Sequence, residues 1–156
     1  MNVHAPAPEG GQGPIEELHG YYFEDLKVGM TAVYGKTITE ASILMFAGVS
    51  GDTNPVHLND EFAEPTRFGG RIAHGMLTAS LISTVIGTKL PGPGCIYVSQ
   101  SLKFRAPVKA GETVTARATI KALDPAKKLA TLATTCSVGG KAVLEGEAVI
   151  LVPSRG

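Results

Sequence analysis

Met76–Lys89 has the pattern of one long helix that is apolar on nearly all of its faces. Only small hydroxyl side chains interrupt its apolar residues, and it contains no carboxylate. A helix that is apolar all round has to be enclosed by protein. The run is too short, and too often interrupted by Thr and Ser, to span a bilayer. We therefore expect a soluble protein built around one central helix.

The second half of the chain is patterned as strands. Pro91-Gly92-Pro93-Gly94 ends the helical pattern, and apolar and polar residues alternate beyond it. Strands are predicted over residues 31–38, 95–104, 113–123, 129–138 and 141–152. In the third of these the apolar face is assigned to Val114, Ala116, Ala118, Ile120 and Ala122. Such strands joined by tight turns favour an α+β fold, with an antiparallel sheet wrapped around a long central helix at about residues 76–89.

Length and composition fit a single folded domain. The chain has 156 residues, of which 44% are apolar and 18% charged. Residues 1–20 are rich in Pro, Gly, Ala and Glu without periodicity, so they cannot bury enough apolar surface to offset their ordering entropy. We predict a flexible tail at 1–20 and a folded domain at 21–156.

Charge and cysteine content limit the possible partners and compartment. Lys plus Arg and Asp plus Glu number 14 each, so we expect no nucleic-acid partner and no membrane partner. The N-terminus lacks the basic start and apolar core of a secretory signal. Cys95 and Cys136, the two cysteines, lie in strand-like runs and are expected to be reduced thiols of a cytoplasmic protein, with a disulfide as the alternative.

The stretch Phe46–Ala63 carries the residues best suited to chemistry. Within it, Gly51-Asp52-Thr53-Asn54-Pro55-Val56-His57 places a carboxylate and an imidazole around a compact turn, and acid–base catalysis uses these two groups most. On a continuous helix the two would point about 140° apart. The proline excludes helix at the residue before it, so the break can turn both side chains into one cleft. A short helix opened by Thr39 leads into this turn.

The motif resembles the signature of the MaoC-like hydratases, the (R)-specific enoyl-CoA hydratase branch of the hot-dog superfamily, at Phe46, Gly51, Asp52, Asn54, Pro55, His57 and Ala63. A second block, Phe68–Leu77, resembles the same family's entry into its central helix, and the likeness covers about Tyr21 to Val152. The resemblance implies a single hot-dog fold and a homodimer or higher homo-oligomer. A sheet with a helix on one face also leaves an edge to cover, which agrees with pairing.

The resemblance implies a hydro-lyase that reversibly hydrates trans-2-enoyl-CoA to (3R)-hydroxyacyl-CoA. Hydration requires a water to lose a proton as it attacks the β-carbon, and Asp52 with His57 can hold and deprotonate that water. The Gly75 amide, at the head of the central helix, is suited to polarise the thioester carbonyl. Each has a plainer alternative: an Asx turn for Asp52, a partly buried polar side chain for His57, and a bend for Gly75. For His74 we expect a structural hydrogen bond.

Three residues are further candidates for substrate binding, and two of them, Ser83 and Ile86, are candidates for contact with the acyl part. By resemblance, Ser83 borders the acyl pocket, although it can instead bond the carbonyl one turn back. Ile86 lies three residues on, hence on the same helix face, and can shape the depth of that pocket. Asn54 either orients Asp52 or closes the turn.

Coenzyme A carries phosphates, so basic residues are expected near the pocket mouth. Lys103 and Arg105 are the first candidates, with Arg67 and Arg71 next, and a solvated strand face explains Lys103 and Arg105 equally well. No P-loop, GxGxxG, paired CxxC or HExxH occurs in the sequence. We predict no metal and no cofactor, because coenzyme A enters as part of the acyl-CoA substrate.

Three other functions remain open at this point. A hot-dog thioesterase would bind the same thioester but direct water at the carbonyl carbon. A dehydratase acting on acyl carrier protein would typically carry an acidic residue on the central helix, and Met76–Lys89 has none. A non-catalytic acyl-CoA-binding module is the third alternative, against which the intact Asp52 and His57 argue.

Overall fold

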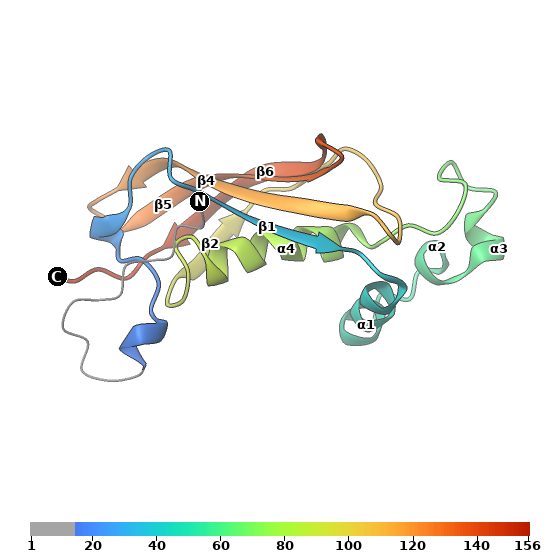
Figure 1. The fold of residues 1–156 in the computed structure, drawn as a ribbon, viewed down its shortest axis with the longest axis horizontal. Coiled ribbons are helices and arrows are strands. Elements are labelled where there is room, and N and C mark those ends of the chain that lie inside the picture. The colour runs from blue at the N-terminus through green and yellow to red at the C-terminus, as the bar shows by residue number, and fades with distance from the viewer. Residues whose placement is uncertain (1–14) are drawn as a thin grey trace.

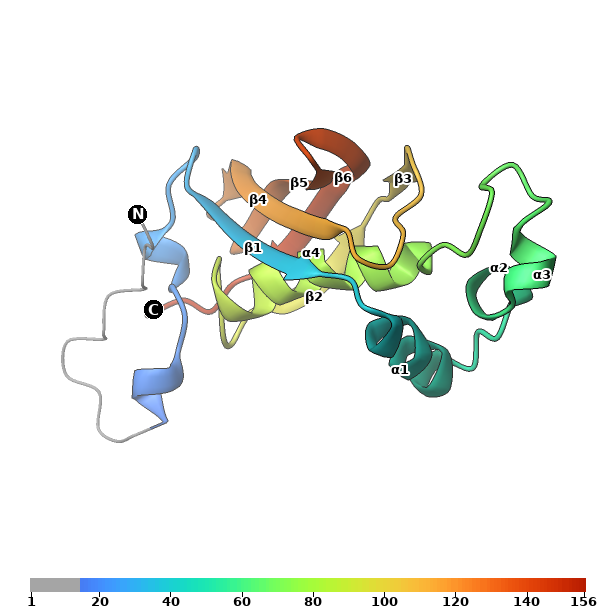
Figure 2. The same cartoon turned by 45° about the vertical axis from the view of Figure 1, so that its right-hand side comes forward.

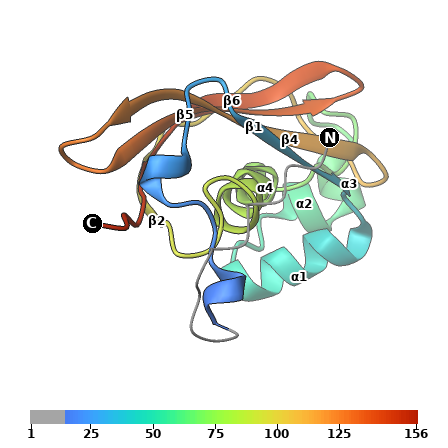
Figure 3. The same ribbon diagram turned by 60° about the vertical axis from the view of Figure 1, so that its left-hand side comes forward.

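The computed structural model describes residues 15–156, which form a sheet arched over one helix (Figures 1 and 3). In this part of the chain the strands are β1 (Thr31–Thr37), β2 (Ile96–Gln100), β3 (Lys103–Phe104), β4 (Thr113–Asp124), β5 (Leu129–Val138) and β6 (Lys141–Leu151). All pairings are antiparallel, in the order β1-β4-β5-β6-β2, with β3 also paired to β6. The sheet is open, and β1 and β2 are its edges.

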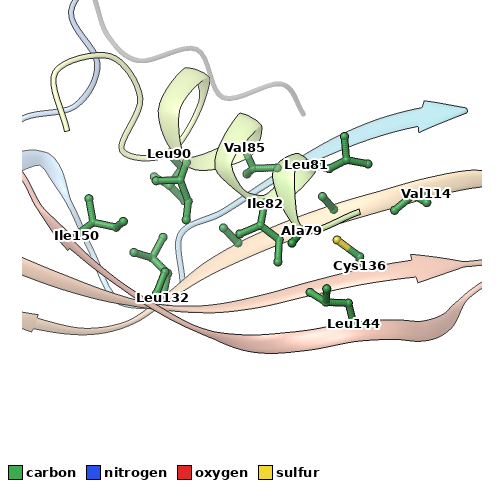
Figure 4. Close-up of a cluster of buried hydrophobic side chains, with 14 of the residues drawn as sticks. Ala79, Leu81, Ile82, Val85, Leu90, Val114, Leu132, Cys136, Leu144 and Ile150 are labelled. Atoms are coloured by element: carbon green, nitrogen blue, oxygen red, sulfur yellow. The ribbon is translucent and has the colours of Figure 1, made fainter. Parts of the chain in front are cut away.

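Helix α4 (Gly75–Thr88) lies against the inner face of the sheet (Figure 2). Its residues Ile82 and Val85 are at most 1% exposed. They belong to one buried cluster with inward side chains of β5 and β6, among them Leu132, Leu144 and Ile150 (Figure 4). The α+β fold predicted from sequence, an antiparallel sheet around one central helix, is confirmed.

Two strand predictions were wrong in detail. Ala122, assigned to the apolar face of its strand, is exposed. An irregularity in the β4–β5 register just before it reverses the alternation of side chains. The strand predicted at 95–104 is divided into β2 and β3. Between them the chain crosses β6 closely at Gly146, where a Cβ would lie 1.8 Å from the carbonyl oxygen of Ser101.

Three short helices lie together beyond the N-terminal end of α4 (Figures 1 and 2). They are α1 (Glu40–Ser50), α2 (Pro55–Leu58) and α3 (Asp60–Ala63). Thr39 caps α1, since its hydroxyl oxygen accepts a hydrogen bond from the N–H of Ser42 at 3.1 Å. The helix ends at Gly51, one of the two stops that the sequence predicted.

Arg71 ties these helices together. Its guanidinium donates to both carboxylate oxygens of Glu40 in α1, at 2.8 and 3.0 Å. Its Nε donates to Asp60 in α3 at 2.6 Å. The approach to α4 is therefore attached to both helices that flank the Asp52–His57 turn.

The segment before β1 contains two short 3₁₀ helices, η1 (Glu16–Leu18) and η2 (Phe23–Asp25). Between them, the N–H groups of Gly20 and Tyr21 donate to the carbonyl oxygens of Pro93 and Pro91, both at 2.8 Å. Residues 1–14 of the predicted tail lie outside the described part, and the tail boundary stays a prediction. None of the helices within residues 15–156 has the length and apolar content that a membrane span requires.

Candidate active site

Asp52 follows directly on the end of α1. Gly51 has a φ of 75°, a left-handed conformation that favours glycine, and it turns the chain out of the helix. Oδ1 of Asp52 then accepts a hydrogen bond from the N–H of Asn54 at 3.2 Å, which is the Asx turn considered above. Asp52 is exposed, and its Oδ2 has no hydrogen-bond partner among residues 15–156. The turn therefore fixes the carboxylate and leaves one oxygen open.

His57 lies in the single turn of α2. Asn54 caps this helix by accepting from the N–H of Val56 at 3.2 Å, and Pro55 occupies its first position. Nδ1 of His57 lies 2.7 Å from the carbonyl oxygen of Ile72. A carbonyl only accepts, so Nδ1 carries the hydrogen and Nε2 carries the lone pair. The half of the ring that can take up a proton is therefore Nε2.

His74 contacts both of these residues. Its Nε2 lies 2.9 Å from the backbone carbonyl oxygen of Asp52, and its ring stacks on the His57 ring with centroids 3.9 Å apart. The side chain is 1% exposed, and within the described residues its Nδ1 has no hydrogen-bond partner. The structural hydrogen bond expected for His74 is confirmed, with Asp52 as its acceptor.

These three side chains converge. One nitrogen or carboxylate oxygen from each of Asp52, His57 and His74 lies within 4.8 Å of those of the other two. A single water can span such a gap, because each of its hydrogen bonds is about 2.8 Å long. The structure thus brings the predicted pair of Asp52 and His57 to one point, at the N-terminal end of α4.

Within residues 15–156 these side chains also form the group close enough to ligate one metal ion. Ligation needs lone pairs that point at a common centre. His57 has its free lone pair at Nε2 and His74 at Nδ1, and the two rings are stacked at an interplanar angle of 29°. Within the described residues, the two rings thus offer one free nitrogen each, beside the open oxygen of Asp52.

Gly75 is the first residue of α4, so its N–H has no partner inside the helix. Beside it opens a pocket of about 230 Å³ whose lining includes Arg67, Ile72, Thr78, Phe104, Arg105 and Val143. A Cβ on residue 75 would lie 2.7 Å from Cε1 of Phe104. In this structure the group that approaches Gly75 closely is the ring of Phe104, and the close approach of a substrate stays a prediction.

The two acyl-side candidates lie apart from this pocket. Ser83 is exposed, and among the described residues it does not bond the carbonyl one turn back. Ile86 is 0% exposed. The exposed side of α4 that carries Ser83 also carries Met76, Ser80 and Gly87. Their role toward a substrate stays a prediction.

The basic candidates differ in their partners. Arg105 lines the pocket, and its Nε donates to Glu145 at 2.7 Å. Lys103 is exposed on β3 and has no salt bridge within residues 15–156. Arg67 also lines the pocket, with its guanidinium 5.2 Å from the centre of the Phe68 ring. Of the two arginines at the pocket, Arg67 is the one without a carboxylate partner in the described part.

Sequence reasoning missed Phe104, the residue that faces Gly75. Its ring comes from the two-residue strand β3 and is 52% exposed. The contact depends on how β3 packs against the start of α4, and no local pattern around Phe104 signals it.

Comparison with known proteins identifies the family. The family model described as "MaoC like domain" matches residues 25–141. The (R)-specific enoyl-CoA hydratase of Rhodospirillum rubrum is 57% identical over 141 residues, which cover 90% of this chain and 98% of that protein. The 3-hydroxybutyryl-CoA dehydratase of Methylorubrum extorquens is 50% identical over 141 residues, 90% of each.

Solved structures agree with these relatives. The unliganded R-hydratase PhaJ1 from Pseudomonas aeruginosa superposes with a TM-score of 0.82 at 43% identity, covering 87% of this chain and 88% of that one. The (R)-hydratase from Aeromonas caviae gives a TM-score of 0.80 at 44% identity, covering 83% and 99%. The hot-dog fold implied by the motif is confirmed, and this chain belongs to the MaoC-like family.

Proposed function

We propose that this protein is a hydro-lyase that reversibly hydrates trans-2-enoyl-CoA to (3R)-hydroxyacyl-CoA. The observation that carries the proposal is the meeting of Asp52 and His57 beside the start of α4, in a chain 57% identical to an (R)-specific enoyl-CoA hydratase. The names of the relatives support both the reaction and its stereochemistry.

In the proposed mechanism, one water lies between Asp52 and His57. It donates one hydrogen bond to the open carboxylate oxygen and the other to Nε2 of His57, the two acceptors identified above. As the water oxygen bonds to the β-carbon, its proton passes to this pair, and a proton is then returned to the α-carbon. The closeness of these side chains supports the roles, since one ligand atom from each of Asp52, His57 and His74 lies within 4.8 Å of the others, a distance that one water can bridge.

Negative charge builds on the thioester oxygen during this step, and the Gly75 N–H is the proposed donor to it. The amide begins a 14-residue helix whose dipole favours negative charge at this end. The pocket beside Gly75 is the proposed place for the thioester. The ring of Phe104 forms one wall of this pocket and fixes how close a ligand can come to the amide.

The proposed reaction has no need of a metal or redox cofactor. It adds the elements of water without oxidation or reduction, and side chains supply both the base and the acid. Coenzyme A is part of the substrate. Arg67, Lys103 and Arg105 are the proposed contacts for its phosphates, and Arg67 is favoured at the pocket because Glu145 already pairs with Arg105.

We further propose that two copies pair through the β2 edge. Ile96 and Val98 of this strand are 59% and 57% exposed, and an exposed apolar edge is a liability that a second chain removes. Pairing through β2 would extend the sheet into the second copy, because β2 is an edge strand. The proposed location is the cytoplasm, in keeping with free thiols at Cys95 and Cys136.

The test is to mix the protein with crotonyl-CoA and follow two signals. Hydration removes the ultraviolet absorbance of the conjugated enoyl thioester without releasing a thiol. A thioesterase would release free coenzyme A, which a disulfide reagent detects, and a binding module would change neither signal. Thiol release as the main outcome, or no change in either signal, would refute the proposal.

A further inference from the structure

We infer that His74 is a positioning residue of this site: it holds Asp52 and His57 in place relative to each other and does not touch the substrate. The inference rests on the proposed hydratase function, which uses both of those residues. Three observations carry it, namely the hydrogen bond to Asp52, the stack on His57, and the unpartnered nitrogen of the His74 ring.

The hydrogen bond from His74 is the long-range contact of Asp52 itself, beside the bonds that tie Val56 and His57 of the same turn to Ile72. Other hydrogen bonds of Asp52 in the described chain are local: its N–H donates to Oγ of Ser50, and its Oδ1 accepts from Asn54. Local bonds fix the shape of a turn but not its place relative to the rest of the fold. Nε2–H of His74, 22 residues away, donates to the Asp52 carbonyl oxygen at 2.9 Å and supplies that placement.

The ring of His74 also supports His57. Their centroids lie 3.9 Å apart, and Phe46 of α1 packs on His74 with centroids 4.9 Å apart. His57 itself is bonded to the carbonyl of Ile72, two residues before His74. Gly75 is the next residue along the chain. The segment 72–75 therefore sets the positions of Asp52 and His57, the proposed acid–base residues, together with that of the proposed amide donor.

Stability alone does not account for a histidine here. Because Nε2 carries the hydrogen, Nδ1 is a bare acceptor, and it is buried without a partner in the described residues. An unpaired buried polar atom is unfavourable, and an apolar ring of the same shape would avoid it. The same burial keeps Nδ1 from exchanging protons with a substrate, so the role left for His74 is to hold its neighbours.

A matched pair of variants tests the inference. In His74→Gln the side-chain amide nitrogen reaches the place of Nε2 and can still donate to Asp52. In His74→Met, which has nearly the same length and volume, the donor is gone. We expect His74→Met to lower kcat for crotonyl-CoA hydration about 10- to 100-fold, the effect of a misplacement near 1 Å. We expect His74→Gln to keep kcat within about threefold of the parent enzyme.

A third variant, His74→Phe, keeps a flat ring beside His57 and removes both nitrogens. Its kcat should fall as in His74→Met, while its melting temperature should stay within about 3 °C of the parent or rise, since the orphan nitrogen is removed. A residue that merely stabilised the fold would lose melting temperature and activity together. If the Phe variant fails to fold, the Gln and Met pair decides the question.

The decisive comparison uses Asp52→Asn as background. If His74 acts through Asp52, adding His74→Met to Asp52→Asn should cost less than about twofold in residual kcat, because effects of residues that act as a unit are not additive. Equal losses in both backgrounds, parental kcat in His74→Met, or equally poor Gln and Met variants would each overturn the inference that His74 acts through its hydrogen bond to Asp52. A parent protein that fails to hydrate crotonyl-CoA would instead refute the proposed function, and the inference with it.

Discussion

Substitution of Gly75 by alanine tests both the pocket and the proposed amide donor. The added Cβ would lie 2.7, 3.0 and 3.3 Å from three ring carbons of Phe104. Carbon atoms in contact prefer about 3.5–4.0 Å, so the ring or the start of α4 has to move by about 1 Å. The perturbation is thus small in volume and falls on the atoms that shape the proposed thioester site.

The cost in stability should be small. Overpacking typically costs about 1–3 kcal/mol, and the lower end applies here because Phe104 is 52% exposed and can swing outward. Gly75 lies in a helix and has no positive φ. Alanine there also stabilises the folded protein by about 0.4–1 kcal/mol, because it lowers the conformational entropy of the unfolded chain. We expect a net loss of about 0–2 kcal/mol in the free energy of unfolding.

The cost in activity should be large. Displacing the amide donor, or pushing the ring into the pocket, is expected to lower kcat for crotonyl-CoA about 100-fold or more. The assay is steady-state hydration beside a thermal melt. The matched control is Phe104→Leu, which removes the ring carbons that the added Cβ at position 75 would strike. It is measured alone and combined with Gly75→Ala.

The double variant should recover much of the activity that Gly75→Ala loses. Parental kcat in the folded Gly75→Ala protein would refute the role of this amide. An inactive double variant beside an active Phe104→Leu control would show that the added methyl crowds the ligand itself, and would refute the reasoning that Phe104 transmits the effect.

Two further predictions concern the cysteines and the helices around the site. Burial raises the pKa of Cys136 to about 12 and also raises that of Cys95, so neither thiol should react rapidly with a disulfide reagent at pH 8 in the native protein, and the buried Cys136 should react only after denaturation. Rapid reaction of either thiol in the native protein would contradict this. Arg71→Met should lower the free energy of unfolding by about 1 kcal/mol, because its partners Glu40 and Asp60 are 52% and 81% exposed and such pairs are individually weak. Chemical denaturation measures the loss, which should shrink in high salt; a salt-independent loss would mean that packing, not ion pairing, holds these helices.

Local patterns predicted the parts of the fold whose causes are local. The apolar run Met76–Lys89 indicated the enclosed helix α4, which spans Gly75–Thr88 in the structure. Likewise, the glycine, the proline and the capping asparagine of the Asp52–His57 turn fix its shape within a few residues. That shape is why the approach of Asp52 to His57 could be expected from the sequence.

Features that depend on packing between distant segments could not be predicted. The contact of His74 with Asp52 spans 22 residues. The contact of Phe104 with Gly75 requires β3 and α4 to be placed already. The irregularity that exposes Ala122 belongs to the β4–β5 register and could not be predicted, since the apolar–polar alternation of the sequence continues through that position.

The central claim is that Asp52 and His57 together activate one water, and Asp52→Asn tests it most directly. The amide has the shape of the carboxylate but cannot take up the proton, so the variant should keep the fold and the KM for crotonyl-CoA while kcat falls by about 100-fold or more. Combining it with His57→Gln should cost little more than either change alone. A folded Asp52→Asn enzyme with near-parental kcat would contradict the account.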